Sequence, residues 1–82
     1  MIRKTINQKV NVTAVYFQNK QLKTFPRRIE LNGDIYTFQD GLSCDIRRGD
    51  SLTQIFDMSD GSANYRLRRD ADNWTLVNIT HA

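Results

Sequence analysis

The sequence predicts an all-β protein, folded as a small antiparallel roll or an SH3-like, partly open barrel of six or seven short strands. Short runs rich in Val, Ile, Thr, Tyr and Phe are separated by turn signals every 8–12 residues. Apolar residues nowhere recur at helical spacing over a long window. We expect the sheet to close or nearly close, because an open sheet of this size would leave long unpaired edges.

The pair Asn32-Gly33 is the strongest turn signal, because both residues tolerate the positive φ of a type I′ turn. A hairpin centred there pairs Leu31 with Asp34 and Arg28 with Thr37. In that register one face, expected to be buried, carries Ile29, Leu31, Tyr36 and Phe38. Strand propensity, turn chemistry and face pattern therefore agree in this stretch.

The other strands follow from alternation and turn residues. We expect strands at residues 9–18, 22–31, 35–39, 42–47, 52–58, 63–69 and 74–80, in a single domain over residues 9–80 behind a mobile lead-in of residues 1–8. Alternation in the fourth strand predicts that its inward residues are Leu42, Cys44 and Ile46. The residues expected to be buried are Ile29, Tyr36, Leu42, Cys44, Ile46, Phe56, Tyr65, Leu67 and Trp74.

Two details of the strands bear on surfaces. Asp60-Gly61 predicts the tip of a second hairpin, with Ser59 opposite Ser62 and Phe56 opposite Tyr65. In that register Ile55 is an apolar residue on the outer face, beside Arg66. Pro26 cannot donate to a ladder, which predicts an edge or a bulge at this point of the second strand.

Composition excludes several classes. A length of 82 residues allows one domain with a modest core. No apolar run approaches the roughly 20 residues that span a bilayer. The basic start lacks the apolar segment of a signal peptide, and a single cysteine allows no internal disulfide. These observations predict a cytoplasmic protein that makes no membrane contact.

Catalytic patterns are missing from the sequence. His81 stands one residue from the end of the chain, and Cys44 reads as a small buried hydrophobe. No Ser/His/Asp set or glycine-rich phosphate loop is present. The acidic turns around Asp60 and Asp72 miss the spacing of a calcium loop. We therefore expect a protein that is not an enzyme and has no cofactor and no metal site.

The net charge of +3 is unevenly distributed, and this suggests nucleic-acid binding as one function. Residues 1–28 contain no acid, whereas residues 40–60 are rich in Asp. Candidate anion-binding residues are Lys20, Lys23, Arg27, Arg28, Arg66 and Arg68. Against this reading, most aromatic residues fall on core faces, and Glu30, Asp45 and Asp57 interrupt the basic stripes.

A protein-interaction module is the favoured function. Small rolls offer an edge strand to an added strand, or a shallow apolar groove. The candidate partner-binding residues are Val15, Phe17, Pro26 and Ile55, which the core faces do not absorb. Self-association belongs to the same class, because a basic first half and an acidic middle attract each other.

The order of apolar and aromatic residues also resembles a group of small bacterial all-β domains of uncharacterised function. The resemblance rests on Pro26-x-x-Ile29-x-Leu31-x-Gly33-x-x-Tyr36-x-Phe38, then Tyr65-Arg66-Leu67, then Trp74-x-Leu76, and covers roughly residues 10–79. Such domains often carry an aromatic residue where this chain has Ile29 or Leu31. The resemblance implies a β-meander and brings no catalytic residue with it.

Overall fold

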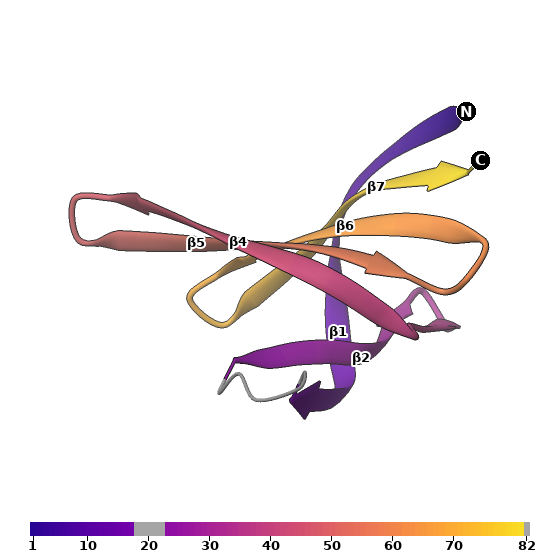
Figure 1. Cartoon of the computed structure of the whole chain (residues 1–82), viewed down its shortest axis with the longest axis horizontal. Coiled ribbons are helices and arrows are strands. Elements are labelled where there is room, and N and C mark those ends of the chain that lie inside the picture. Colours follow the sequence, from indigo (N-terminus) through magenta and orange to yellow (C-terminus); the bar gives the residue numbers. More distant parts are fainter. Residues whose placement is uncertain (18–22, 82) are drawn as a thin grey trace.

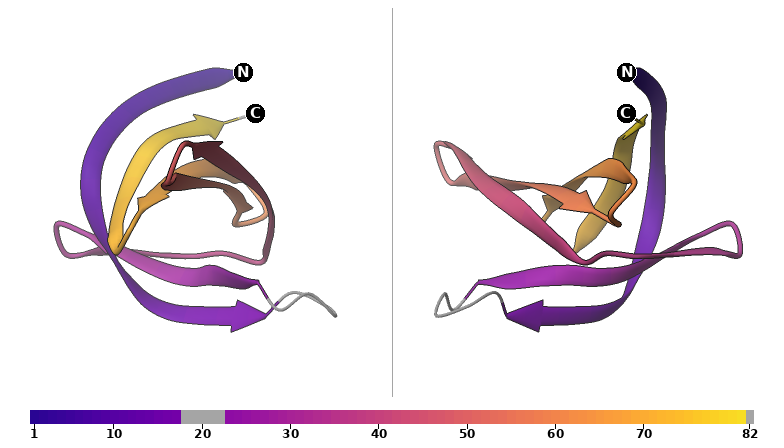
Figure 2. Two further views of the ribbon diagram at one scale, coloured as in Figure 1. Left: turned by 90° about the vertical axis from the view of Figure 1, so that its left-hand side faces the viewer. Right: turned by 45° about the vertical axis from the view of Figure 1, so that its right-hand side comes forward.

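Seven strands form one antiparallel sheet in a computed structural model of the protein, which describes residues 1–17 and 23–81. The sheet has the order β3-β2-β1-β7-β6-β5-β4 and curls round without closing into a barrel, which confirms the predicted all-β roll (Figures 1 and 2). The strands are β1 (Ile2–Phe17), β2 (Thr24–Leu31), β3 (Asp34–Thr37), β4 (Asp40–Arg48), β5 (Ser51–Ser59), β6 (Ala63–Asp70) and β7 (Asn73–His81).

The long strand β1 joins the two parts of the sheet. Its residues Ile2–Val10 pair with β7, and Asn11–Phe17 pair with β2. The register shifts around Asn7, whose φ is 49°, and the strand curves round one side of the molecule (Figure 2). The expected lead-in of residues 1–8 is corrected here, because most of it is the first part of β1, held by backbone pairing to β7.

The core lies between the β1–β2 part of the sheet and the strands that curl over it. Phe56 is fully buried and contacts the rings of Phe25 and Trp74, at 5.5 Å and 5.2 Å between centroids. The buried apolar residues are Val10, Phe25, Ile29, Phe38, Phe56, Met58, Ala63, Tyr65, Leu67, Leu76 and Ile79. Tyr36 and Trp74, which were expected in the core, are partly buried and pack against it.

The β2–β3 hairpin has the predicted register. Leu31 pairs with Asp34 and Arg28 with Thr37, and the turn between them places Asn32 and Gly33 at φ of 52° and 88°. Two positive φ values are the geometry of the type I′ turn that the Asn-Gly pair favours. This hairpin is therefore confirmed down to its paired residues.

The faces of β4 are the reverse of those predicted. Gly41 is buried opposite Met58, whereas Leu42, Cys44 and Ile46 are exposed. The cause is an extra residue before the strand: the Gln39 N–H donates to the Ser59 carbonyl, although Asp40 is the ladder partner of Ser59. Two residues against one form a β-bulge, and a shift of one residue moves every later side chain to the other face.

The β5–β6 hairpin is offset by two residues from the predicted register. Ser59 pairs with Asn64 and Phe56 with Leu67, so each residue keeps its face but gains a different partner. Ile55 accordingly stands opposite Arg68 and not beside Arg66. The longer loop is held by the Asp60 carboxylate.

Asp60 accepts hydrogen bonds from the N–H groups of Ser62 and Ala63 and from the Tyr65 hydroxyl, each at 2.8 Å. Burial of the carboxyl opposes its ionisation, but these donors outweigh it and hold the pKa of Asp60 below its usual value. Burial and the same bond raise the pKa of Tyr65. In its charged form, the Asp60 carboxylate therefore holds the loop between β5 and β6 in place.

Candidate functional site

Exposed large apolar side chains mark the candidate surfaces. Within the described residues they are Met1, Ile2, Val15, Phe17, Ile35, Leu42, Ile46 and Leu52. Two strands carry such residues on one face at even spacing, β1 with Val15 and Phe17 and β4 with Leu42 and Ile46. Scattered exposed apolar residues are ordinary, but sets aligned along a strand form a surface that another chain can cover.

The end of β1 carries the first surface. The last β1 residue that pairs with β7 is Val10, so one side of Asn11–Phe17 has no strand partner in the described part of the chain. Val15 is 56% exposed and Phe17 is 65% exposed. We call Val15, Phe17 and this unpaired side the β1 edge surface.

Tyr16 fixes the geometry of the β1 edge surface from below. Its side chain packs against the core, on the face opposite those of Val15 and Phe17, and its ring stacks on Phe25 at 5.7 Å between centroids. The Arg27 guanidinium lies over the Tyr16 ring, 3.9 Å from its centroid. Burial raises the pKa of the Tyr16 hydroxyl. Tyr16 thus packs this end of β1 against Phe25 and Arg27, while the side chains of Val15 and Phe17 stay exposed.

The other two sequence candidates for partner binding do not extend this surface. Pro26 pairs with Val15 in the β1–β2 ladder but its side chain is fully buried. The register irregularity predicted near Pro26 is present: Arg27 is an extra residue on β2 between the pairs Ala14–Arg28 and Val15–Pro26, and Thr13 is an extra residue on β1 just before them. Ile55 is half-buried on β5, where its cross-strand neighbours are Cys44 and Arg68. The structure therefore brings together Val15 and Phe17 and leaves Ile55 with β4.

Most candidate anion-binding residues are already engaged. Lys23 donates to Asp45 at 2.8 Å and to the Ser43 hydroxyl at 3.0 Å. Arg27 packs on Tyr16 and donates to the Phe38 carbonyl. Arg28 is exposed, and Lys20 lies outside the described residues. Part of the positive charge of the first 28 residues is thus already engaged in contacts within the molecule.

The outer-face arginines are paired as well. Arg66 makes two hydrogen bonds to the Asp57 carboxylate, and Arg68 contacts Asp70 at 2.8 Å. The Asp57 carboxylate holds the pKa of Arg66 above its usual value. Exposed pairs of this kind stabilise little, about 0–1 kcal/mol, but they neutralise the charge that a phosphate would need.

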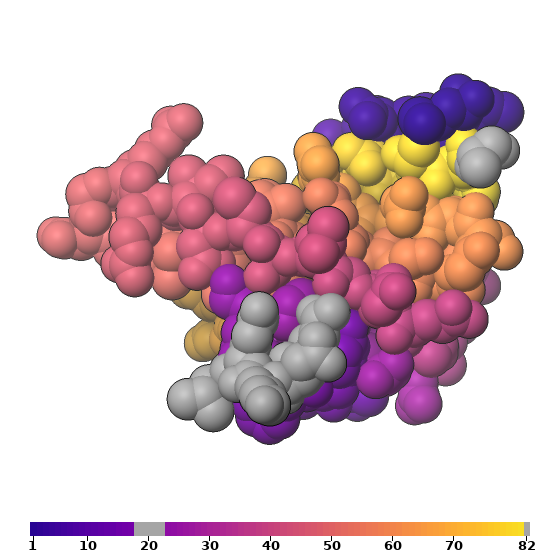
Figure 3. Space-filling view, viewed as in Figure 1, coloured from indigo at the N-terminus to yellow at the C-terminus, as the bar shows by residue number. Residues whose placement is uncertain are grey.

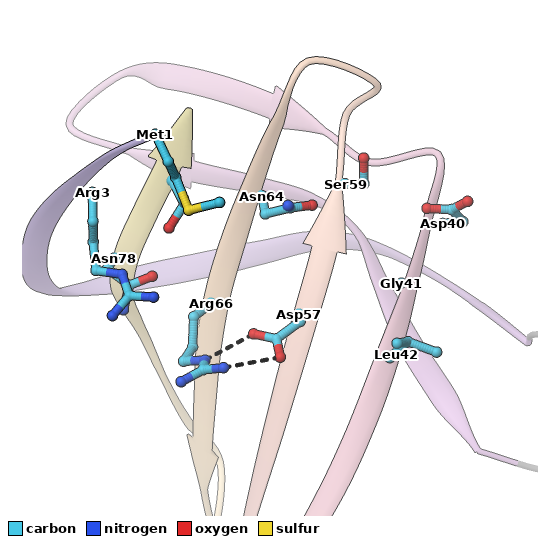
Figure 4. Close-up of a pocket in the computed structure, with 11 residues that line it drawn as sticks. Met1, Arg3, Asp40, Gly41, Leu42, Asp57, Ser59, Asn64, Arg66 and Asn78 are labelled. Carbon is cyan, nitrogen blue, oxygen red and sulfur yellow. Dashed lines mark hydrogen bonds and ion pairs between the residues drawn. The ribbon is translucent and has the colours of Figure 1, made fainter. Parts of the chain in front are cut away.

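An open hollow of about 570 Å³ crosses this outer face (Figure 4). Its walls include Arg3 and Arg66 but also Asp40 and Asp57, so its charge is balanced. Figure 4 shows the Arg66–Asp57 pair in the middle of the hollow, with Leu42 and Asp40 on the β4 side. The hollow is a mixed polar surface and not a basic groove.

No three side chains of His, Cys, Asp or Glu gather as metal ligands within residues 1–17 and 23–81. Cys44 is exposed on β4, and His81 pairs with Ile2 and Ala63 at the end of β7. Nor does the described chain contain a helix long and apolar enough to cross a membrane.

The surface residues that sequence reasoning missed are Leu42, Cys44 and Ile46. A signal for them was present in the turn Gly49-Asp50, whose two residues pair Arg48 with Ser51. Counting back from that pair puts Ser43 opposite Phe56 and Gly41 opposite Met58. If Phe56 and Met58 face the core, Leu42 and its alternate neighbours must face outward.

Comparisons with known proteins gave no match to this chain, whether with protein-family models, with curated proteins or with solved structures. The resemblance to small bacterial all-β domains stays a prediction.

Proposed function

We propose that this chain is a non-catalytic protein-interaction module, and that its partner docks on the β1 edge surface. The observation that carries the proposal is the position of Phe17, which is 65% exposed on a strand with one side unpaired among residues 1–17 and 23–81. Main-chain groups at such an edge can bond an added strand, and alternate side chains provide specificity. A cytoplasmic location is part of the proposal, supported by the lone cysteine.

Two features favour a protein partner. An aromatic side chain is a strong anchor, because covering it removes a large apolar area from water without ordering many rotatable bonds. Tyr16 is packed on Phe25 and Arg27, so the strand that presents Val15 and Phe17 has little freedom to lose on binding.

The charge distribution gives nucleic-acid binding less support. Single strands are held by a continuous basic groove with exposed aromatic rings. Here Lys23, Arg66 and Arg68 are paired with carboxylates. Arg66 and Arg68 lie on β6, which does not pair with β1, and Lys23, next to the Thr24 that pairs with Phe17, is already bonded to Asp45.

The proposal is tested by capture from a lysate of the source cells, with and without nuclease. Phe17→Ser should remove a bound protein that the unmodified chain retains, and moderate salt should have little effect. Ile35→Ser is the matched control, since Ile35 is equally an exposed apolar residue but lies on β3. The bound protein should survive this change.

The opposite result is equally clear. If the captured material is nucleic acid, disappears with nuclease and weakens steadily with salt, the proposal fails. Loss of that material on reversing Arg28, Arg66 and Arg68 to Glu, with Phe17→Ser silent, would establish the alternative function.

A further inference from the structure

β4 is an edge strand of the sheet. It is the last strand in the sheet order, and β5 is its only strand partner among residues 1–17 and 23–81. With β5 it forms a hairpin whose tip stands out from the body of the molecule (Figures 1 and 3). A long exposed edge of this kind invites pairing with another strand.

The backbone groups on the free side of β4 can be assigned from the turn. Gly49 has a φ of 60° and Asp50 has no positive φ, which is the pattern of a two-residue type II′ turn. Such a turn closes on a hydrogen-bonded pair, here Arg48 and Ser51. Even-numbered β4 residues therefore bond to β5, and the N–H and C=O groups that point to the free side belong to Gly41, Ser43, Asp45 and Arg47.

The outer face of β4 is apolar in its middle and charged at its ends. Leu42 is 76% exposed and Ile46 is 43% exposed, with Cys44 exposed between them. Asp40 and Arg48, both exposed, stand at the two ends of the same row. The half-buried Ile55 of β5 lies opposite Cys44 and widens the apolar centre.

This row of exposed β4 side chains matches a second copy of itself that runs in the opposite direction. If a second β4 runs antiparallel with Cys44 opposite Cys44, Leu42 falls opposite Ile46 and Asp40 falls opposite Arg48. Apolar residues then meet apolar residues at the centre, and opposite charges meet at both ends. We propose that two copies of the chain associate by antiparallel pairing of their β4 strands about a twofold axis at Cys44.

The backbone fits the same register. That register places Ser43 opposite Asp45 and Gly41 opposite Arg47. Each residue whose N–H and C=O groups point to the free side of β4 therefore faces such a residue of the other copy. The inner face raises no charge conflict, because Lys23 already neutralises Asp45. The pair at Cys44 is then a non-hydrogen-bonded one, in which side chains lie closest.

Other arrangements of two β4 strands lose this fit. Parallel pairing in register sets Asp40 against Asp40 and Arg48 against Arg48. A slip of two residues sets Leu42 against Arg48 or Ile46 against Asp40. An isologous interface requires one patch to match its own reverse, and the Cys44-centred register meets that requirement.

The decisive experiment is sedimentation equilibrium over a range of concentrations with charge-reversal variants of the full chain. Arg48→Asp alone puts two carboxylates at each end of the paired strands, and Asp40→Arg alone puts two cations there. Each single change should weaken the dimer about tenfold, because the charge pair at each of the two ends of the paired strands changes from attractive to repulsive. The double variant Asp40→Arg/Arg48→Asp should recover the affinity of the unmodified chain.

Rescue by the double variant separates a specific contact from general damage, since a chain that fails to fold cannot regain affinity. A short bis-maleimide should join two copies through Cys44. The matched control carries Cys44→Ser with Ser62→Cys, which moves the thiol to an exposed loop between β5 and β6, and should give no linked dimer.

Several results would overturn the inference. The inference fails if the chain sediments as a monomer at every concentration. It also fails if both single charge reversals leave the affinity of the dimer unchanged. A double variant no better than the single ones also contradicts the register. Phe17→Ser should leave the dimer intact, so the outcome is independent of the partner proposed for the β1 edge surface.

Discussion

Gly41→Ala should destabilise the protein, although a glycine in a strand is usually improved by alanine. Gly41 is buried on the inner face of β4, opposite Met58. A Cβ atom there would overlap the Met58 sulfur, and would lie 2.7 Å from the Met58 Cε and 2.9 Å from the Asp57 carbonyl oxygen. Favourable carbon contacts need about 3.5–4.0 Å.

Two opposing effects set the size of the change. Replacing glycine by alanine restricts the unfolded chain and stabilises by about 0.4–1 kcal/mol where the native site accepts it. Overpacking a core costs about 1–3 kcal/mol. Met58 is fully buried and the Asp57 oxygen belongs to the backbone, so relieving the overlap must move core side chains or the β5 backbone. The clash should win, with a net loss of about 1–2 kcal/mol.

Urea unfolding followed by the fluorescence of Trp74, the single tryptophan, measures this loss. In a Met58→Val background the sulfur and Cε are gone, and Gly41→Ala should cost distinctly less. Gly49→Ala is the comparison, because its site is open and its cost comes only from placing alanine at a φ of 60°, so Met58→Val should leave that cost unchanged. A variant as stable as the unmodified chain, or an equal loss in both backgrounds, would refute the reasoning.

Two further stability predictions follow from the core and from the β5–β6 loop. Phe56→Ala should cost about 3–5 kcal/mol in urea unfolding, because it removes a fully buried ring between Phe25 and Trp74; a loss below 1 kcal/mol would contradict the described core. Asp60→Asn should cost about 1 kcal/mol at neutral pH, since the amide cannot serve all three donors as well as the carboxylate does. The native pKa of Asp60 is lowered, so its stabilisation is complete above the unfolded pKa of about 3.9 and is lost as the pH falls through the native value. The difference between the two proteins should therefore shrink in acid, and a difference that grows there would show that the charged form is not the stabilising one.

The two proposed surfaces make different demands on the chain. The β1 edge surface uses a rigid strand end with an exposed aromatic residue, and β4 uses a row that matches its own reverse. Phe17→Ser and the Asp40/Arg48 charge reversals therefore form a crossed set. Each change should abolish or weaken one association and leave the other intact.

The strands themselves were predictable from local sequence. Turn residues and alternation located all seven. Asn32-Gly33 also predicted the exact pairing of its hairpin, because a two-residue turn allows the flanking strands only one register. The exposure of Val15 and Phe17 also followed from sequence, since Val10, Val12, Ala14 and Tyr16 already supply the inner face of β1. These features depend only on contacts between near neighbours.

The tertiary structure decided which edge of the sheet is left open and which face of a strand is inside, although for β4 the turn Gly49-Asp50 also carried a signal. The extra residue at Gln39-Asp40 turns Leu42, Cys44 and Ile46 outward, and the Asp60 carboxylate moves the β5–β6 register by two residues. β1 extends through both parts of the sheet because β7 pairs with its first residues. Alternation along one strand cannot reveal such changes, because a bulge or a longer loop alters the pairing without altering the pattern of apolar residues.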